Sequence, residues 1–469
     1  MSTYPIPFAG GSYKSLSLPY SAQTTKNMFF EVRAGGRSVA ALHGMPGLKL
    51  FGAAGDGRDR GLCIHKGILY RVTEQSLYSV SSSGVATLVG LISGSNQCVM
   101  VSDSNYLVIA TGGTAYTYDE TTLAEITDTD LESPYTVTYN NSRAIYDGAG
   151  SRFCVADVGQ PSVIDGLNYA TAEASPGQIL AVKAHKQYVF VMCSKHIEPW
   201  FDSGVGSPPY DRVNGGVMQI GLGARYSVDS DEDYIYFLDN NREPRRLAGI
   251  TLQNIGNPGL ADEFRQYSTI DDAKGFCFSM QKDRFYVLSF PSANRTWMYQ
   301  ESINEWLQLS HGQDNDRHRA NSYAYAYNKH IVADWETGTL YEWDLNTYSD
   351  NGDAITRERT TQPLFAAMIS PQLAGKEIFM TCLELVIESG VGLATGQGVA
   401  PVVMMQFSDD GGATWSGELW ESAGVMGARH WRLRWYNLGN FVARVFRFRC
   451  TDPVKWSFLS CHADLDVGV

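Results

Sequence analysis

The chain from Asp283 to Asp344 contains five short runs of β-forming residues: DRFYVLSF (283–290), TWMYQ (296–300), EWLQL (305–309), HIVADW (330–335) and TLYEWD (339–344). Turn sequences (PSANR, ESIN and ETG) separate most of them, and a longer polar loop precedes HIVADW. Short runs rich in Tyr, Trp, Phe and Val between turn residues are typical of antiparallel strands. Because the same pattern recurs upstream, the sequence predicts an all-β protein built as a β-propeller.

The upstream repeats are unevenly spaced. One aromatic or apolar residue in each repeat serves as a marker: Tyr70, Tyr106, Phe153, Tyr188, Tyr234, Phe285 and Ile331. Their spacings run from 35 to 51 residues, and periods of roughly 40 to 50 residues with several short strands are typical of propeller blades. The spacing is compatible with an irregular propeller of six or seven blades. Neither a WD dipeptide at fixed phase nor a kelch pattern appears.

The flanking segments have different patterns. Residues 1–55 are irregular and are interpreted as an N-terminal arm, which either adds a strand to the first blade or is held by a neighbouring subunit. The propeller is assigned to 56–345 and a polar linker to 346–362. Residues 363–469 contain longer alternating strands, which predict a separate C-terminal β-sandwich.

The amino-acid composition limits the kinds of protein that this chain can be. Hydrophobic residues make up 44% and charged residues 19%, which predicts an ordinary folded core. There are 50 acidic against 37 basic residues, a formal charge of −13. Static DNA binding is disfavoured because phosphate contacts need clustered cations. The same acidity would suit a surface along which DNA slides, although solubility alone also explains it.

The eight cysteines are scattered and none forms a CxxC pair. This pattern favours free core thiols in a protein that folds in a reducing compartment. The N-terminus has no charged segment followed by an apolar run, so we expect no signal peptide. No stretch approaches eighteen apolar residues, so we expect no membrane insertion.

One local motif points to an enzyme class. The segment Ser408–Trp415 (SDDGGATW) resembles the Asp-box that recurs in sialidases and other propeller glycosidases. In those enzymes the box is a folding device at the blade periphery. A single copy outside the repeats therefore predicts a structural hairpin.

The sequence gives only weak support for metal-binding or catalytic residues. Asp229, Asp231 and Asp233 resemble the start of a calcium loop, but Tyr234 and Asn240 stand where an EF-hand has Gly and Glu. A second polar run contains Asp344, Asn346, Asp350 and Asp353, and it is interpreted as linker. The nine histidines are single, and the pair His196 and Glu198 has no third ligand nearby. We expect no catalytic residue, metal or cofactor.

Two further features are structural candidates. Asn257 followed by Pro258 predicts the start of a short helix at a blade edge, with Leu260, Phe264 and Tyr267 on one face. Six arginines in the last domain allow three interpretations: solvated strand faces, a subunit or partner interface, or contact with DNA. They are Arg429, Arg432, Arg434, Arg444, Arg447 and Arg449.

Several segments resemble one protein family. They are SKHIEPWFDSG (194–204), GVMQIGLGARYSVDSDEDYIYFLDNNREPRRL (216–247), YVLSFPSANRTWMYQESINEWLQL (286–309) and ARVFRFRCTDPVKWSFLSC (443–461). They are similar to packaged-DNA stabilisation proteins, the tail hub or nozzle of short-tailed bacteriophages. The likeness covers nearly the whole chain, although its motifs are diffuse aromatic patterns.

The resemblance implies a structural virion protein made in the host cytoplasm, and no enzyme. It implies a homo-oligomeric ring, a hexamer, below the portal and its head-to-tail adaptor proteins. Such a ring extends the DNA channel, helps to retain the packaged genome and anchors tailspike, fibre or needle proteins. DNA would pass through it without sequence-specific binding.

Two other classes remain as alternatives. A sialidase-like propeller glycosidase would carry several Asp-boxes, and a pocket of arginines and acids at the propeller centre. A receptor-binding tail protein would show a trimeric fibre pattern, and the sequence has no heptad or collagen-like segment.

Overall fold

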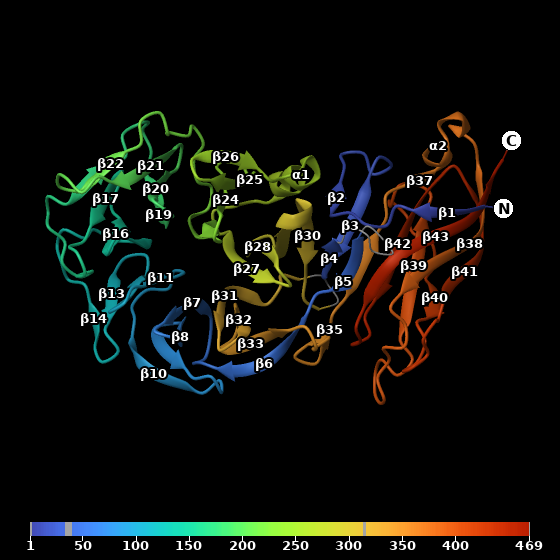
Figure 1. The fold of residues 1–469 in the computed structure, drawn as a ribbon, viewed down its shortest axis with the longest axis horizontal. Coiled ribbons are helices and arrows are strands. Elements are labelled where there is room, and N and C mark those ends of the chain that lie inside the picture. The colour runs from blue at the N-terminus through green and yellow to red at the C-terminus, as the bar shows by residue number, and fades with distance from the viewer. Residues whose placement is uncertain (1, 33–39, 313–315, 469) are drawn as a thin grey trace.

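We analysed a computed structural model of the chain, which describes residues 2–32, 40–312 and 316–468. Seven blades of four antiparallel strands each surround a common centre, and a β-sandwich lies beside this ring (Figure 1). Both chain ends lie at the sandwich (Figure 1). The all-β prediction of a propeller followed by a sandwich is confirmed, and the blade number is seven.

The first three blades each consist of four consecutive strands. Blade 1 contains β7 (Asp59–His65), β8 (Ile68–Thr73), β9 (Ser76–Val80) and β10 (Ala86–Leu91). Blade 2 contains β11 (Val99–Ser102), β12 (Leu107–Ala110), β13 (Ala115–Tyr118) and β14 (Leu123–Glu125). Blade 3 contains β15 (Val137–Asn140), β16 (Arg143–Asp147), β17 (Arg152–Val155) and β18 (Tyr169–Thr171).

The next three blades follow the same plan. Blade 4 contains β19 (Ile179–His185), β20 (Tyr188–Cys193), β21 (Ile197–Asp202) and β22 (Tyr210–Arg212). Blade 5 contains β23 (Asp229–Ser230), β24 (Tyr234–Leu238), β25 (Pro244–Ala248) and β26 (Thr251–Asn254). Blade 6 contains β27 (Lys274–Met280), β28 (Asp283–Phe290), β29 (Arg295–Gln300) and β30 (Glu305–Leu309).

Blade 7 joins two distant parts of the sequence. It contains β31 (Ala320–Ala326), β32 (Lys329–Asp334), β33 (Thr339–Asp344) and, as its outer strand, β6 (Gly47–Ala53). The end of the expected N-terminal arm therefore completes the last blade, and this pairing closes the ring. The expected polar loop before HIVADW contains β31, whose small and polar residues concealed the strand.

The sandwich combines both ends of the chain. One sheet contains β4 (Met28–Val32), β5 (Ala40–Gly44), β43 (Ser457–Val467), β38 (Ile378–Ile387) and β41 (Leu433–Phe441), and β1 (Ser2–Ile6) pairs with β43. The facing sheet contains β3 (Ala22–Lys26), β36 (Arg357–Thr360), β42 (Ala443–Cys450), β39 (Val402–Ser408) and β40 (Leu419–Ser422). The short strands β2 (Tyr13–Lys14) and β37 (Leu364–Phe365) pair with β3 and β42.

The segment 346–362, expected as a polar linker, includes strand β36 between β3 and β42. All four residues of β36 are buried although three of them are charged. Composition suggested a linker because charged residues are rarely buried without partners. The remaining strands of this segment are β34 (Ser349–Asp350) and β35 (Asp353–Ala354).

The two parts of the molecule are joined through strand β3. It pairs with β36 of the sandwich and, at Lys26 and Gln308, with β30 of blade 6, so one sheet runs across the junction. A single apolar cluster also contains residues of both parts, among them Phe285 of blade 6 and Phe458 of the sandwich. The sandwich is therefore packed directly against the propeller.

The predicted helix is α1 (Pro258–Gln266), and the side chain of Asn257 caps it by accepting a hydrogen bond from Leu260 N at 2.8 Å. A second, four-residue helix is α2 (Ala366–Ile369). In the described part of the chain, neither helix has the length and apolar character needed to cross a bilayer. All eight cysteines are free thiols, and burial raises the pKa of Cys63 and Cys98 to about 12.

The buried His318 gives the fold a pH dependence. Its Nδ1 accepts a hydrogen bond from Ala320 N at 3.2 Å, and burial lowers its pKa from 6.5 to about 4. Between these pH values the unfolded chain binds a proton that the folded chain does not, so the free energy of unfolding decreases as the pH falls. The expected loss is up to about 3 kcal/mol.

The variant His318→Asn tests this pH dependence, because an amide oxygen can accept the same hydrogen bond without titrating. Denaturant unfolding of wild type and variant at pH 7 and pH 4 is the measurement. We expect the variant to lose less stability than wild type on acidification. Equal losses in both proteins would show that His318 does not titrate as described.

Candidate functional site

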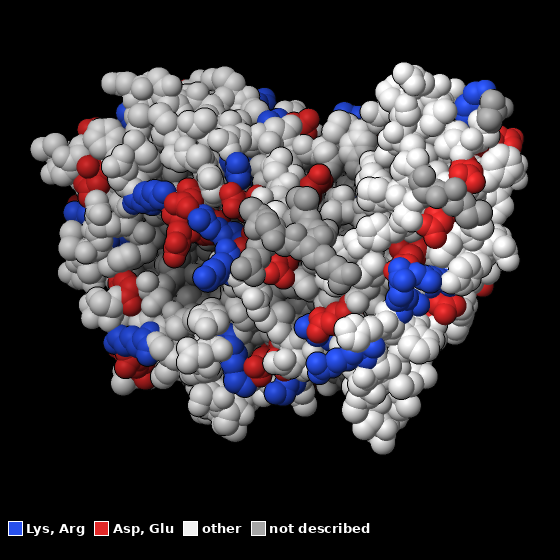
Figure 2. All heavy atoms as spheres, turned by 45° about the vertical axis from the view of Figure 1, so that its right-hand side comes forward, with Lys and Arg blue, Asp and Glu red and all other residues white. Residues whose placement is uncertain are grey.

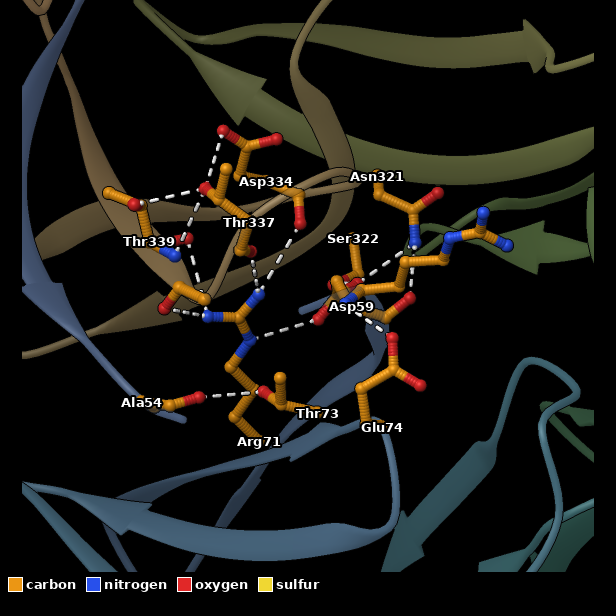
Figure 3. Close-up of polar contacts among 12 residues, drawn as sticks. Ala54, Asp59, Arg71, Thr73, Glu74, Asn321, Ser322, Asp334, Thr337 and Thr339 are labelled. Carbon is orange, nitrogen blue, oxygen red and sulfur yellow. Dashed lines mark hydrogen bonds and ion pairs between the residues drawn. The ribbon is translucent and has the colours of Figure 1, made fainter. Parts of the chain in front are cut away.

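A buried arginine holds the two ends of the propeller ring together. Arg71 of β8 has no exposed surface and points from blade 1 into blade 7 (Figure 3). Its guanidinium donates to the carbonyl oxygens of Gly338, of Thr337 at 3.1 Å and of Asp334 at 3.3 Å. Because these acceptors are main-chain atoms of blade 7, Arg71 ties blade 1 to blade 7 at the point where the propeller ring closes. We call Arg71 and its partners the clamp.

Asp59 completes the clamp from the inner strand of blade 1. Its carboxylate accepts from Arg71 Nε at 3.2 Å, from Asn321 Nδ2 at 2.9 Å and from Ser322 Oγ at 2.6 Å (Figure 3). Gly338 is required here because a Cβ atom would lie 1.6 Å from the carbonyl oxygen of Gly55. The closure therefore combines a charged pair with very close main-chain contact.

The centre of the propeller is a small cavity lined by residues from the inner edge of all seven blades. Its volume is about 240 Å³. Side chains meet across this centre, because Lys274 of blade 6 donates to Gln97, just before blade 2, at 2.8 Å. Duplex DNA, whose major groove alone is about 12 Å wide, therefore has no passage through an individual propeller.

Each cation at this cavity has a polar partner, and two of the three are paired with carboxylates. Lys183 Nζ lies 3.1 Å from Asp229 Oδ1, and Arg225 Nη1 lies 2.6 Å from Asp147 Oδ2. Lys274 donates to Gln97 Oε1 at 2.8 Å, and burial lowers its pKa to about 8. Arg225 is the one arginine among the residues that line the described cavity. The glycosidase alternative expected several arginines with acids at this place.

The first acidic motif forms a turn stabilised by basic residues. Asp231 accepts hydrogen bonds from the main-chain N–H groups of Asp233 and Tyr234, at 2.8 and 2.7 Å. Asp233 pairs with Arg284 at 2.6 Å. These contacts use the carboxylates without a metal ion.

The second acidic run is also engaged by its neighbours. Asp350 accepts from His311 Nδ1 at 3.1 Å, and Asp344 accepts from Asn346 N at 3.1 Å. Within the described residues, no three His, Cys, Asp or Glu side chains converge in a way that could hold a metal ion.

His196 and Glu198 lie together in blade 4, where both are fully buried. His196 Nε2 is 3.2 Å from Glu198 Oε1, which also accepts from Ala174 N at 2.8 Å. The second carboxylate oxygen accepts from Trp200 Nε1 at 3.2 Å. The pair therefore tethers a loop to the blade interior and is closed to solvent.

The Asp-box segment forms the hairpin between β39 and β40. Asp410 accepts from Ser408 Oγ at 2.6 Å and from Thr414 N and Oγ1, and these bonds hold its pKa well below the usual range. Gly412 donates to Ser408 Oγ at 2.7 Å and has a φ of +100°. Trp415 stacks against Arg447 at 4.0 Å. The motif thus forms a hairpin, as the sequence predicted.

The C-terminal arginines have different environments. Arg444 is buried between the rings of Phe407 and Phe441 and pairs with Asp409 at 2.6 and 2.7 Å, so the solvated-face interpretation is wrong for it. Arg432 and Arg434 both bind Glu384 on the outer face of the sandwich.

Sequence reasoning missed three buried arginines, Arg71, Arg357 and Arg359, which have no exposed surface. Arg359 donates to the carbonyl oxygens of Phe8 and Gly10, each at 2.7 Å, and so fixes the N-terminal segment. The acceptors lie hundreds of positions away in the sequence. No local pattern could have identified these clamps.

Comparison with solved structures finds neighbours of low similarity. The designed protein Ika8 has a TM-score of 0.38 at 10% identity and covers 63% of this chain and 100% of its own. The WD40 domain of Pan2 from Neurospora crassa has a TM-score of 0.40 at 8% identity, with coverages of 61% and 89%. PorZ, a surface component of the type-IX secretion system of Porphyromonas gingivalis, has a TM-score of 0.36 at 13% identity. That match covers 66% of this chain and 42% of the PorZ chain.

A comparison with curated proteins found no match. Family models do match, and they cover both parts of the molecule. Residues 4–348 match the model described as "Bacteriophage P22 Gp10, beta-propeller", and residues 365–466 match "Bacteriophage P22 Gp10, beta-sandwich". The chain therefore belongs to the bacteriophage P22 Gp10 family and is a structural protein of a phage tail.

Proposed function

We propose that this protein is the tail hub, or nozzle, of a short-tailed phage. In this role, several copies form a closed ring, a hexamer, below the portal and its adaptor proteins. The ring extends the DNA channel, helps to retain the packaged genome and anchors tailspike, fibre or needle proteins. The match of both the propeller and the sandwich to one phage tail family carries this proposal.

The size of the central cavity supports a channel built from several copies. Lys274 and Gln97 meet across the hole of the propeller and leave no room for duplex DNA, so the proposed conduit lies between subunits. Each propeller then forms part of the wall of the ring. The contacts that close the propeller between blades 1 and 7 make this wall rigid.

The charge supports passage of DNA without binding. With 50 acidic and 37 basic residues, the chain repels phosphates on average. DNA in contact with a surface of net negative charge would slide without sequence-specific binding.

We further propose that the protein has no catalytic activity and is made in the host cytoplasm. Free thiols fit synthesis in a reducing compartment. The glycosidase alternative has little support, because one Asp-box lies in the sandwich and one arginine lines the central cavity.

Phage carrying a nonsense mutation in this reading frame test the proposal. Grown without suppression, the particles should fill with DNA and then lose it, so that their DNA becomes accessible to nuclease. Supplying the wild-type chain from a plasmid should restore protected DNA and infectivity. Particles that lack the protein yet keep nuclease-resistant DNA and a complete tail would overturn the proposal.

A further inference from the structure

One end of the propeller cavity is rich in hydrogen-bond donors. Gln97, Tyr226 and Lys274 all line the cavity, and they lie just before or at the start of blades 2, 5 and 6. Lys274 Nζ donates to Gln97 Oε1 at 2.8 Å. The start of blade 6 also lies against the turn that contains Tyr226, since a Cβ atom on Gly275 would be 2.4 Å from Ser227 O. We call Gln97, Tyr226 and Lys274 the donor cluster.

The donor cluster has more hydrogens to donate than acceptors to receive them. An ammonium group has three N–H donors, an amide has two and a phenol has one O–H donor. Gln97 Oε1 accepts from both Lys274 and Asn321 Nδ2, the latter at 3.3 Å. Among the described residues, the buried Tyr226 hydroxyl has no hydrogen-bond partner. In a folded protein, such a group is typically explained by a bound water molecule or ion.

The acceptors at this end of the cavity are already engaged. Asn321 Oδ1 accepts from Arg317 Nη2 at 2.6 Å, and Thr136 Oγ1 accepts from Val182 N at 3.1 Å. A water molecule would bring two more donors to a site that has a surplus of them. An anion accepts hydrogen bonds on every side and has few or no hydrogens to donate, so it fits the donor cluster better than water does.

The buried charge at the donor cluster is positive. Three ion pairs near the cavity are balanced, namely Lys183–Asp229, Arg225–Asp147 and Arg71–Asp59. Lys274 and Arg317 remain, and neither has a carboxylate oxygen of the described residues within 4.0 Å. Apart from the paired Asp59, the charge of one carboxylate, Asp272, acts on both cations. Two cations therefore face one carboxylate, which leaves a surplus of one positive charge.

Burial makes this surplus costly. Arg317 is only 6% exposed, and its Nε has no hydrogen-bond partner in the described part of the chain. Burial and the charge of Arg317 lower the pKa of Lys274 to about 8. A buried cation without a counter-ion destabilises a fold, and an anion beside it reduces that cost.

The cavity has room for an ion and is too small for most organic ligands. Its volume is about 240 Å³, whereas small-molecule sites typically have about 300–1,000 Å³. On the face of the molecule drawn in Figure 2, basic and acidic side chains are mixed on the outer surface. The surplus of positive charge is therefore a feature of the interior.

We propose that the donor cluster binds one small inorganic anion, such as chloride or phosphate, at the centre of the propeller. The ion accepts hydrogen bonds from Lys274, from the amide of Gln97 and from the hydroxyl of Tyr226. It thereby links the segments that lead into blades 2, 5 and 6. This inference concerns the folded chain itself and does not depend on the proposed role in the tail.

Thermal unfolding of the purified chain tests the site. The reference buffer contains sodium gluconate, whose anion is bulky, and sodium chloride or sodium phosphate replaces it at constant ionic strength. We expect the unfolding midpoint to rise by about 2–3 °C and then to level off as the bound form saturates. The salt that acts at the lower concentration identifies the preferred ion.

Three variants separate the donor cluster from a general effect of salt. Lys274→Met should remove the response to chloride and phosphate. Lys183→Met is the matched control, because this lysine lines the same cavity but is paired with Asp229, and it should respond like wild type. Gln97→Glu places a carboxylate next to the Lys274 ammonium, so it should be as stable in gluconate as wild type is in the preferred salt, with no further response.

Two results would overturn the anion site. One is a wild-type midpoint that is the same in all three salts, and the other is an equal response in wild type and Lys274→Met. If Lys274→Met fails to fold, Gln97→Glu decides, since a full response in that variant also contradicts the proposal. Crystals grown with sodium bromide locate the ion directly: we expect an anomalous peak beside Lys274 Nζ, and bromide peaks on the outer surface alone would contradict it.

Discussion

Replacing Arg71 with Met is expected to lower the free energy of unfolding by about 3–5 kcal/mol. The substitution leaves Asp59 buried without its cation and removes the donor to the carbonyl oxygens of blade 7. Both partners of the Arg71–Asp59 pair are fully buried, so water cannot replace the lost contacts. Denaturant unfolding of the purified chain, followed by tryptophan fluorescence, measures the effect.

The matched control is Arg432→Met, the same substitution at an arginine whose side chain is 60% exposed. Exposed ion pairs contribute about 0–1 kcal/mol, so this variant should unfold close to wild type. If Arg71→Met behaved like Arg432→Met, the β6–β33 pairing and the other contacts between blades 1 and 7 would hold the ring closed without Arg71. The clamp would then have no role in stability.

Replacing Arg359 with Met is expected to cost about 3 kcal/mol or more, because several buried acceptors lose their donor at about 1–3 kcal/mol each. The acceptors include Phe8 O and Gly10 O, and also Thr25 Oγ1 at 2.9 Å and Gln23 Oε1 at 2.7 Å. The N-terminal segment should loosen first. Hydrogen exchange should therefore rise in β1 and β3 before it rises in the propeller.

The control for this variant is Arg265→Met on the exposed face of α1, where the pair with Asp262 contributes little. Limited proteolysis offers a second measurement, since a loosened N-terminus is cleaved early. Unchanged exchange in β1 together with unchanged stability would show that Phe8, packed on Phe448 and Phe458, anchors the segment without Arg359.

Much of the propeller could be predicted because each blade repeats one local signal. The seven sequence markers fall in seven different blades, and Tyr70, Tyr188, Tyr234, Phe285 and Ile331 lie on the second strand of theirs. Tyr106 directly precedes the second strand of blade 2, and Phe153 lies on the third strand of blade 3. Aromatic and β-branched runs between turns are decided by neighbours in sequence, and this is why they were recognisable.

The junction could not be predicted in the same way. Strand β36 has the sequence RERT, which matches a solvated linker, and it is buried only because distant groups accept its hydrogen bonds. Strand β6 pairs with β33 nearly 300 residues later, and no local pattern encodes that pairing. Sequence reasoning therefore identified the repeat and missed the contacts that close it and join it to the sandwich.

Cryo-electron microscopy of the intact phage particle tests the central claim most directly. We predict a ring of copies around the tail axis, DNA density in the channel that the subunits enclose, and no duplex inside any single propeller. Duplex density threading the hole of one propeller, or the chain located away from the tail axis, would contradict this account.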